Sequence, residues 1–197
     1  MTQRTVFTRE MIVDAAFQLT RAHGWAFVTA RTIAEKLGSS TMPLYSTLKS
    51  MEEIEKEVRA RAEACMHGYQ REKYTDEVLL SSAVGYVVFA RDEKNLFRFL
   101  YVDRPVAAGQ GGDKGQARDV QELGGVVDLV DQATVALKDP MVLKNWAFTH
   151  GLASLISSGV IDLPTARIAT LLTEVGSAIY YMDVLQKKTK AKEGGKK

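Results

Sequence analysis

The sequence predicts an all-α fold, on three observations. Apolar residues recur at three- and four-residue steps through most of the chain, alternating runs of β-branched residues are few, and the four prolines mostly stand at the ends of segments. With 197 residues, the chain is long enough for one domain or two small ones around a sizeable core. We therefore expect helices joined by short connections.

The composition excludes several classes of protein. Apolar residues make up 46% of the chain and charged residues 25%, as in ordinary globular domains. No apolar run reaches the roughly 18 residues that a membrane span needs, and residues 1–9 lack the apolar core of a signal peptide. The single Cys65 excludes an intrachain disulfide and suits a reducing compartment. We expect a cytoplasmic protein without a membrane segment.

The net charge of +2 is unevenly placed along the chain. Residues 1–50 carry six basic and three acidic groups, residues 187–197 carry six lysines and one glutamate, and the stretch between them is net acidic. A basic front on an acidic body suits a partner that is a polyanion and binds at one end only.

The first predicted helix begins after Thr8, a favourable N-cap, and ends at Gly24. Its apolar stripe repeats at helical spacing and consists of Ile12, Ala15, Ala16 and Leu19. Trp25 and Phe27 in the short apolar connection that follows are expected to belong to the core of this small domain.

Two further short helices meet at Gly38. Thr29 is a good N-cap for the first of them, and Gly38 can take the left-handed conformation that ends a helix at low cost. The second runs from Ser40 to Leu48 and keeps Pro43 in its first turn, where the missing N–H has no intrahelical partner. A helix, a short glycine turn and a second helix form a helix-turn-helix unit.

The outer face of that second helix is thin and polar, which suits entry into a DNA major groove about 12 Å wide. An ordinary helical hairpin inside a core has the same spacing, so the helix pair alone leaves both interpretations open. The flanking residues favour the DNA-binding helix-turn-helix. After the pair, Ser50 and Glu53 form a Ser-x-x-Glu capping box that opens a long helix with an apolar line through Ile54, Val58, Ala62, Cys65 and Tyr69.

Three groups of residues occur together at a specific spacing in roughly the first third of the chain. They are Ala15-Ala16 with Leu19 and Gly24; Val28-Thr29-x-Arg31-x-Ile33-Ala34-x-x-Leu37-Gly38-x-Ser40; and Leu44-Tyr45, Lys49-Ser50 and Glu52-Glu53-Ile54. With them, the first 60 or so residues resemble the TetR family of bacterial transcriptional regulators. The resemblance implies a three-helix DNA-binding domain followed by a larger helical domain that dimerises and usually binds a small effector.

Two departures from the family pattern affect the expected DNA contacts. The family usually has an aromatic ring near Leu48 and a phosphate-contacting lysine where Met51 stands, and Thr47 also replaces a larger residue. Lys49 and Lys56 lie close by in the sequence and can compensate for the missing lysine. We expect weaker nonspecific affinity or a different docking tilt, with the fold retained.

DNA binding needs phosphate contacts for position and base contacts for sequence choice. For phosphate we expect Thr29 and Arg31, at the start of a helix whose N–H groups favour an anion, with Tyr45 and Lys49. For bases we expect the short or apolar side chains of Ser39, Ser40, Thr41 and Met42. A two-fold dimer would place two recognition helices about 34–36 Å apart on a near-palindromic operator.

The rest of the chain reads as helices separated by a glycine-rich loop between Asp103 and Gly112. Surplus aromatic side chains in this part predict a pocket for a small apolar or aromatic effector. They are Tyr86, Phe89, Phe97, Phe99, Tyr101, Trp146 and Phe148. A plain hydrophobic core explains the same residues equally well, so both interpretations stay open.

The last two predicted helices carry small residues and two parallel apolar lines, which suits a four-helix bundle across a two-fold axis. The expected interface residues are His150, Gly151, Leu172, Gly176 and Ile179. A monomeric core is the alternative. The lysine-rich tail at residues 187–197 is expected to be disordered.

No catalytic constellation or cofactor motif stands out, and none of the three histidines has a metal-ligand partner three or four residues after it. The predicted organisation is a helix-turn-helix DNA-binding domain at 1–50, an effector-binding and dimerisation domain at 51–186 and the tail. We interpret the chain as a homodimeric transcriptional regulator that represses by occupying promoter DNA. The alternatives are a helical protein-interaction module without DNA binding and, least favoured, an all-α enzyme.

Overall fold

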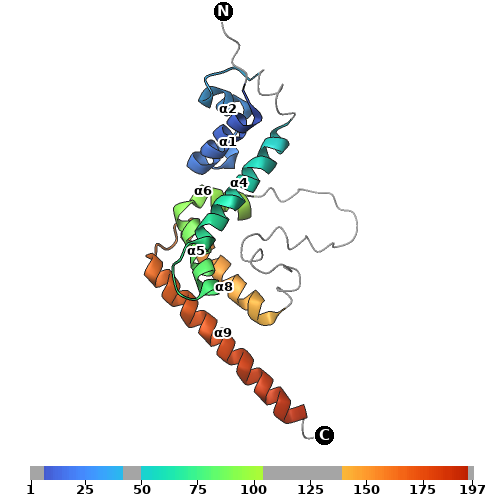
Figure 1. Ribbon diagram of the computed structural model, residues 1–197, viewed down its shortest axis with the longest axis vertical. Coiled ribbons are helices and arrows are strands. Elements are labelled where there is room, and N and C mark those ends of the chain that lie inside the picture. The colour runs from blue at the N-terminus through green and yellow to red at the C-terminus, as the bar shows by residue number, and fades with distance from the viewer. Residues whose placement is uncertain (1–6, 42–49, 104–138, 195–197) are drawn as a thin grey trace, which may run out of the picture. The chain divides into compact units, whose positions relative to one another are not determined.

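The computed structural model describes residues 7–41, 50–103 and 139–194, with residues 189–194 described by their backbone alone. Every regular element in these ranges is a helix, which confirms the expected all-α class (Figure 1). The predicted recognition helix beyond Thr41, and the predicted loop and helix between residues 104 and 137, lie outside these ranges. The chain forms two compact units, which are described separately below.

The first helix of the first unit, α1 (Arg9–His23), begins and ends where the sequence predicts. Thr8 Oγ1 accepts a hydrogen bond from the backbone N–H of Met11 at 3.2 Å, and Gly24 has a φ of 83°. The residues that α1 buries are Ile12, Val13, Ala15, Ala16, Leu19 and Thr20. The one-turn helix η1 (Trp25–Phe27) follows, but Phe27 is 46% exposed and lies against the ring of His23, so its predicted place in the core is wrong.

The next helix, α2 (Ala30–Lys36), is short and buries Ile33 and Ala34. Gly38 has a φ of 65°, as predicted for the residue that ends this helix, and the N–H of Ser39 bonds back to the carbonyl of Ala34 at 2.9 Å. The chain therefore leaves α2 through a tight turn that only glycine adopts without strain.

The long helix α4 (Met51–Arg71) starts after Ser50, whose Oγ accepts the N–H of Glu53 at 3.3 Å in the predicted cap. Fully buried residues recur along it at every fourth position, namely Ile54, Val58, Ala62 and Met66. The four-residue step thus continues to Met66, and Cys65 is only half-buried. Burial, together with the charge of Glu93, raises the pKa of the Cys65 thiol, which disfavours the reactive thiolate.

The short helix α6 (Lys94–Tyr101) belongs to the first unit, although its sequence lies far beyond residue 50. Arg21 at the end of α1 donates to both carboxylate oxygens of Glu93, from Nε at 2.7 Å and through a second, very short contact from Nη2. Glu93 is only 5% exposed, and Asn95 Nδ2 donates to the Arg21 carbonyl at 3.0 Å. These bonds hold α6 against α1.

Phe99 anchors the other side of α6. Its ring lies 5.1 Å from the ring of Trp25, and the guanidinium of Arg59 stands 4.6 Å from its centroid. The sequence predicts a domain boundary after residue 50. The compact first unit of the structure also contains the first part of α4, up to Cys65, and all of α6.

The second unit contains α5 (Val78–Asp92), which crosses the end of α4 at close range. A Cβ on Gly85 would stand 2.7 Å from the carbonyl carbon of Tyr69 and 2.8 Å from Cα of Gln70. Residues 84–90 are all buried, while Val78 and Leu79 at the start of α5 are exposed. The absence of a side chain at Gly85 is what lets the two helix backbones meet.

The last two helices are α8 (Pro140–Ser157), capped by Asp139, and α9 (Thr165–Gly194), and they pack against each other (Figure 1). Arg91 of α5 donates to the Leu163 carbonyl and to Thr165 Oγ1, which fixes the start of α9. α9 continues to Gly194, so the expected disorder from residue 187 onward is wrong up to that point. Lysine favours helix, and the Lys187–Asp183 ion pair at 2.7 Å links neighbouring turns.

Candidate nucleic-acid interface

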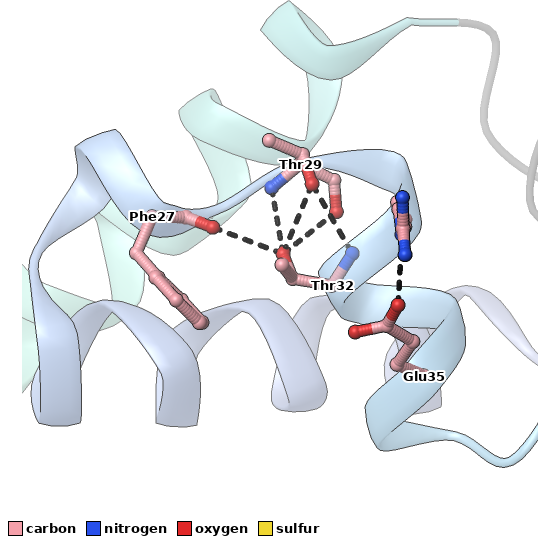
Figure 2. A network of polar contacts seen from close by, with 5 residues as sticks. Phe27, Thr29, Thr32 and Glu35 are labelled. Atoms are coloured by element: carbon pink, nitrogen blue, oxygen red, sulfur yellow. Dashed lines mark hydrogen bonds and ion pairs between the residues drawn. The ribbon is translucent and has the colours of Figure 1, made fainter.

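The start of α2 is built by two threonines (Figure 2). Thr29 Oγ1 accepts the N–H of Thr32 at 3.1 Å, and Thr32 Oγ1 accepts the N–H of Thr29 at 2.9 Å, so each side chain caps the other backbone. Thr32 Oγ1 also lies 3.0 Å from the carbonyl of Phe27, to which it can donate. Thr29 stays exposed, and its hydroxyl proton is not needed for the cap.

Arg31 stands in the first turn of α2 and is 84% exposed. Its Nε donates to Oε1 of Glu35, one turn further along, at 2.9 Å. This hydrogen bond raises the pKa of Arg31, which is charged in any case. Arg31 is therefore placed at the surface where we expect a phosphate, but it is already in contact with an anion.

The residues that follow the turn at Gly38 are accessible. Ser40 and Thr41 are exposed and Ser39 is half-buried, with its Oγ donating to the Ser40 carbonyl at 3.2 Å. Met42, Tyr45 and Lys49 lie outside the described residues. The structure thus brings Thr29, Arg31, Ser39, Ser40 and Thr41 together on the short segment around α2, and the other predicted contacts stay predictions.

A groove of about 550 Å³ opens beside this segment, between the start of α2 and the start of α4. Its lining is Trp25, Val28, Thr29, Ala30, Arg31, Thr41, Met51, Glu52 and Glu55. Met51 stands where the TetR pattern has a lysine, and the charged side chains that α4 contributes to the described lining, Glu52 and Glu55, are carboxylates. Arg31 is therefore the one cation among the described residues of this lining.

Two arginines hold α1 against α4 in the same unit. Arg9 of α1 contacts Glu53 at 2.8 Å and Glu57 at 2.7 Å, and Arg61 of α4 contacts Asp14 at 3.3 Å. Arg9 and Arg21, which binds Glu93, are two of the six basic groups that the sequence places in residues 1–50. Part of the positive charge there is therefore compensated by carboxylates inside the unit.

The expected effector residues fall into both units. Phe97, Phe99 and Tyr101 belong to the first unit. In the second unit, Tyr86 is fully buried and its hydroxyl lies 2.8 Å from Nδ1 of His150, on which Trp146 stacks at 4.9 Å. The remaining two are Phe89, in edge contact with Tyr69, and the half-buried Phe148.

This part of the second unit contains buried polar atoms that sequence reasoning missed. The indole N–H of Trp146, the hydroxyl of Ser82 and the side-chain amide of Gln70 have no hydrogen-bond partner in the described chain. Burial lowers the pKa of His150, so its neutral form is favoured. The signal in the sequence was weak, because a serine, a glutamine and a tryptophan on apolar helices are common.

Of the expected dimer residues, Gly176 lies against α8 of the same chain. Leu172 is only 7% exposed, and Asn145 Oδ1 stands 3.4 Å from the position of a Cβ on Gly176. Gly151 is exposed and His150 and Ile179 are half-buried. What α9 leaves uncovered is a different line, here called the α9 strip, which consists of Ala178, Tyr181, Met182 and Leu185.

No protein-family model and no curated protein matches the sequence. Among solved structures, a TetR-like transcriptional regulator from Rhodococcus sp. RHA1 aligns with 88% of this chain and 96% of its own, at a TM-score of 0.55 and 17% sequence identity. The chain has a TetR-like fold. At this low sequence identity the structural similarity shows the fold alone. The evidence for the function is in the residues.

Within the TetR-like fold, the first unit contains α2, the first helix of the predicted pair, whereas the second helix of that pair lies outside the described residues. The second unit contains the long paired helices α8 and α9. The Arg31–Glu35 pair could be read from the sequence, because oppositely charged residues four apart on a helix are neighbours. The pairs between α1 and α4 and the Arg21–Glu93 contact could not, since they join residues separated by 44 positions or more.

Proposed function

We propose that this protein is a DNA-binding transcriptional regulator that acts in the cytoplasm as a homodimer. The observation that carries the proposal is the segment from Thr29 to Thr41, where exposed hydroxyl groups and one exposed arginine surround a glycine turn at the edge of a compact helical unit. Repression follows from occupying promoter DNA and needs no further chemistry.

The exposed side chains fit the two kinds of contact that DNA requires. Thr29 can donate its hydroxyl proton to a phosphate, and Arg31 can bring a charge-assisted bond to the same strand. Ser40 and Thr41 can contact base edges, and the threonine methyl can pack on a thymine methyl. Short side chains of this kind give modest discrimination, about 1–3 kcal/mol per base pair at the better positions.

The α9 strip supports a two-fold dimer. Tyr181 is 64% exposed, Met182 52% and Leu185 41%, and they lie on one side of the helix with Ala178. By length and composition α9 could also cross a membrane, but one helix of this kind is weak evidence. A second copy of the chain would cover the strip by pairing two such helices, which is the arrangement that a near-palindromic operator requires.

Release by a small effector is part of the proposal. Buried donors without a partner are costly, and a ligand that accepts from the Trp146 indole and packs on apolar neighbours would remove that cost. A ligand changes DNA affinity only if it favours one spacing of the two recognition helices. A thermal-shift screen with apolar and aromatic hydrogen-bond acceptors tests this part, and the absence of any stabilising compound would count against it.

The alternatives make different predictions. A protein-interaction module would show no salt-dependent affinity for DNA, and an all-α enzyme would need acid–base or metal chemistry that no motif in the sequence suggests. The fold is compatible with all three, because function depends on sites that are placed on folds.

The test is a binding titration of the purified protein on DNA from upstream of its own gene, at a series of salt concentrations. A regulator should bind with an affinity that falls steeply as salt rises, because each neutralised phosphate releases counterions. The double variant T41A/Y45A should lose this binding and keep the oligomeric state of the wild type in sedimentation.

The matched control is Y74A/T75A, which makes the same two kinds of substitution in the second unit and should bind DNA as the wild type does. Undiminished binding by T41A/Y45A would refute the assigned residues. A wild-type protein that shows no salt-dependent binding to any duplex would refute the function.

A further inference from the structure

We propose that Glu35 competes with the DNA backbone for Arg31 and thereby sets the affinity of this surface for DNA. The inference rests on the proposed function and deepens it, because it names an acidic residue that opposes binding at the same site. Glu35 is here an affinity-setting residue that acts through Arg31.

The geometry of the pair carries the proposal. Arg31 Nε and Glu35 Oε1 are 2.9 Å apart, and the side chains are 84% and 61% exposed. Figure 2 shows Glu35 one turn along α2 from the Thr29–Thr32 cap, with a dashed bond to its partner. A phosphate that approaches Thr29 and Arg31 therefore meets a guanidinium that already has a carboxylate beside it.

The exchange is possible because the pair is exposed. Water and salt screen such pairs strongly, so Arg31 can leave Glu35 without a large loss. The carboxylate then remains within one helical turn of the bound phosphate and repels it. Replacing Glu35 by a neutral side chain removes both the competitor and the repulsion.

The charges around the Arg31–Glu35 pair increase the effect of this single carboxylate on DNA binding. Among the described residues that line the adjacent groove, Arg31 is the one cation, and the other charged residues are Glu52 and Glu55. Arg9 and Arg21 are bound to carboxylates of their own. Because Glu35 is bonded to that cation, its charge directly offsets the positive charge that the described lining offers to a phosphate.

A phosphate contact carries no sequence information. Glu35 should therefore weaken binding to all duplexes by a similar factor. The consequence is a protein that spends less time on unrelated DNA at a given concentration, while its ratio of operator to nonspecific affinity stays the same.

The experiment compares wild type, E35Q, R31A and R31A/E35Q by fluorescence anisotropy on a labelled duplex of unrelated sequence and on the upstream DNA. E35Q should bind both duplexes about fivefold more tightly at low salt, with a gain that shrinks as salt rises. R31A should weaken binding and lower the salt slope by about one for each protomer in contact with DNA. In the R31A background, E35Q should give a clearly smaller gain in affinity, because there is no arginine left for Glu35 to bind.

The matched control is E52Q. It removes the same charge from an exposed residue of the same groove, but Glu52 makes no ion pair with Arg31 in the described chain, so its gain should be smaller than that of E35Q. Circular dichroism confirms that each variant keeps its helices.

Equal or weaker DNA binding by E35Q, in a protein whose wild type does bind, would overturn the inference and leave the proposed function standing. Equal gains for E35Q and E52Q would overturn the pairwise competition. A wild type that binds no duplex at any salt concentration would instead overturn the proposed function on which the inference rests.

Discussion

The two compact units solve helix packing in different ways. The first joins its helices with charged side chains, as Arg9 reaches from α1 to α4 and Arg21 reaches from α1 to the carboxylate before α6. In the described part of the second unit, the contacts that join helices run to uncharged groups, namely the bare backbone at Gly85, the Tyr86–His150 hydrogen bond, and the carbonyl and hydroxyl to which Arg91 donates. The charged unit carries the surface proposed for DNA, and the neutral unit carries the long apolar helices.

The comparison teaches that counting basic residues overestimates the charge a DNA-binding surface can offer. The sequence places six basic groups in residues 1–50, but Arg9, Arg21 and Arg31 are all in contact with carboxylates. It also teaches where each unit is vulnerable. The first should respond to the removal of charges, and the second to small changes in volume and to protonation of its histidine.

The largest effect is expected from Gly85→Ala in the neutral unit. The added methyl would lie 2.7 Å from the carbonyl carbon of Tyr69, so the two helix backbones must move apart, and we expect the free energy of unfolding to fall by about 3 kcal/mol. Urea denaturation followed by circular dichroism measures it.

Gly68→Ala on the exposed side of α4 is the matched control. Nothing lies within 4 Å of its would-be Cβ, and alanine favours helix, so this variant should be as stable as the wild type or more so by up to about 1 kcal/mol. A similar loss of stability in both variants would mean that the close helix crossing at Gly85 is not the cause of the destabilisation.

The next effect is expected from Arg21→Ala in the charged unit. It takes away the arginine that binds both oxygens of a carboxylate only 5% exposed, and we expect a loss of about 2 kcal/mol because Arg21 itself is half-exposed. Arg98→Ala removes an exposed ion pair with Asp103 and should cost about 0.5 kcal/mol or less. Equal losses would contradict the view that the buried carboxylate makes the difference.

The smallest effect is a pH dependence of the neutral unit. Burial lowers the pKa of His150 in the folded protein, so the unfolded chain binds a proton more readily and stability is lost as the pH falls below about 6.5, the ordinary value for histidine. The neutral ring can also accept the Tyr86 hydroxyl proton through Nδ1, which the protonated ring cannot do.

Unfolding curves between pH 7.5 and 5.5 should therefore show a steeper loss for the wild type than for His150→Gln, which does not titrate. Parallel curves for the two proteins would show that His150 makes no contribution. The range stays above the pH at which ordinary carboxylates take up protons, so the difference isolates the imidazole.

Local signals in the sequence were sufficient for much of the first unit. The caps at Thr8, Thr29 and Ser50 and the ends at Gly24 and Gly38 depend on a few adjacent residues, and the structure confirms each of them. The all-α class followed from periodicity, and the TetR-like fold followed from the family resemblance of the residues around Gly38.

What the sequence left undecided depends on contacts between distant residues. Periodicity placed α6 with the later helices, but the Arg21–Glu93 contact and the Trp25–Phe99 ring pair join it to α1 and η1. Periodicity also marked two apolar lines on α9 without telling which of them packs inside the chain. Leu172 is buried and Gly176 lies against Asn145 of α8, whereas the other line is buried at Ile168 and becomes exposed only from Ala178 onward.

The α9 strip has a consequence for the newly made protein. A newly synthesised chain that folds alone carries tyrosine, methionine and leucine side chains in water along one side of its last helix, and such a surface invites nonspecific association. Two chains that meet along it would hide that surface and stabilise each other by mass action. In that case the quantity of protein in the cell, as well as its sequence, determines how long each copy survives.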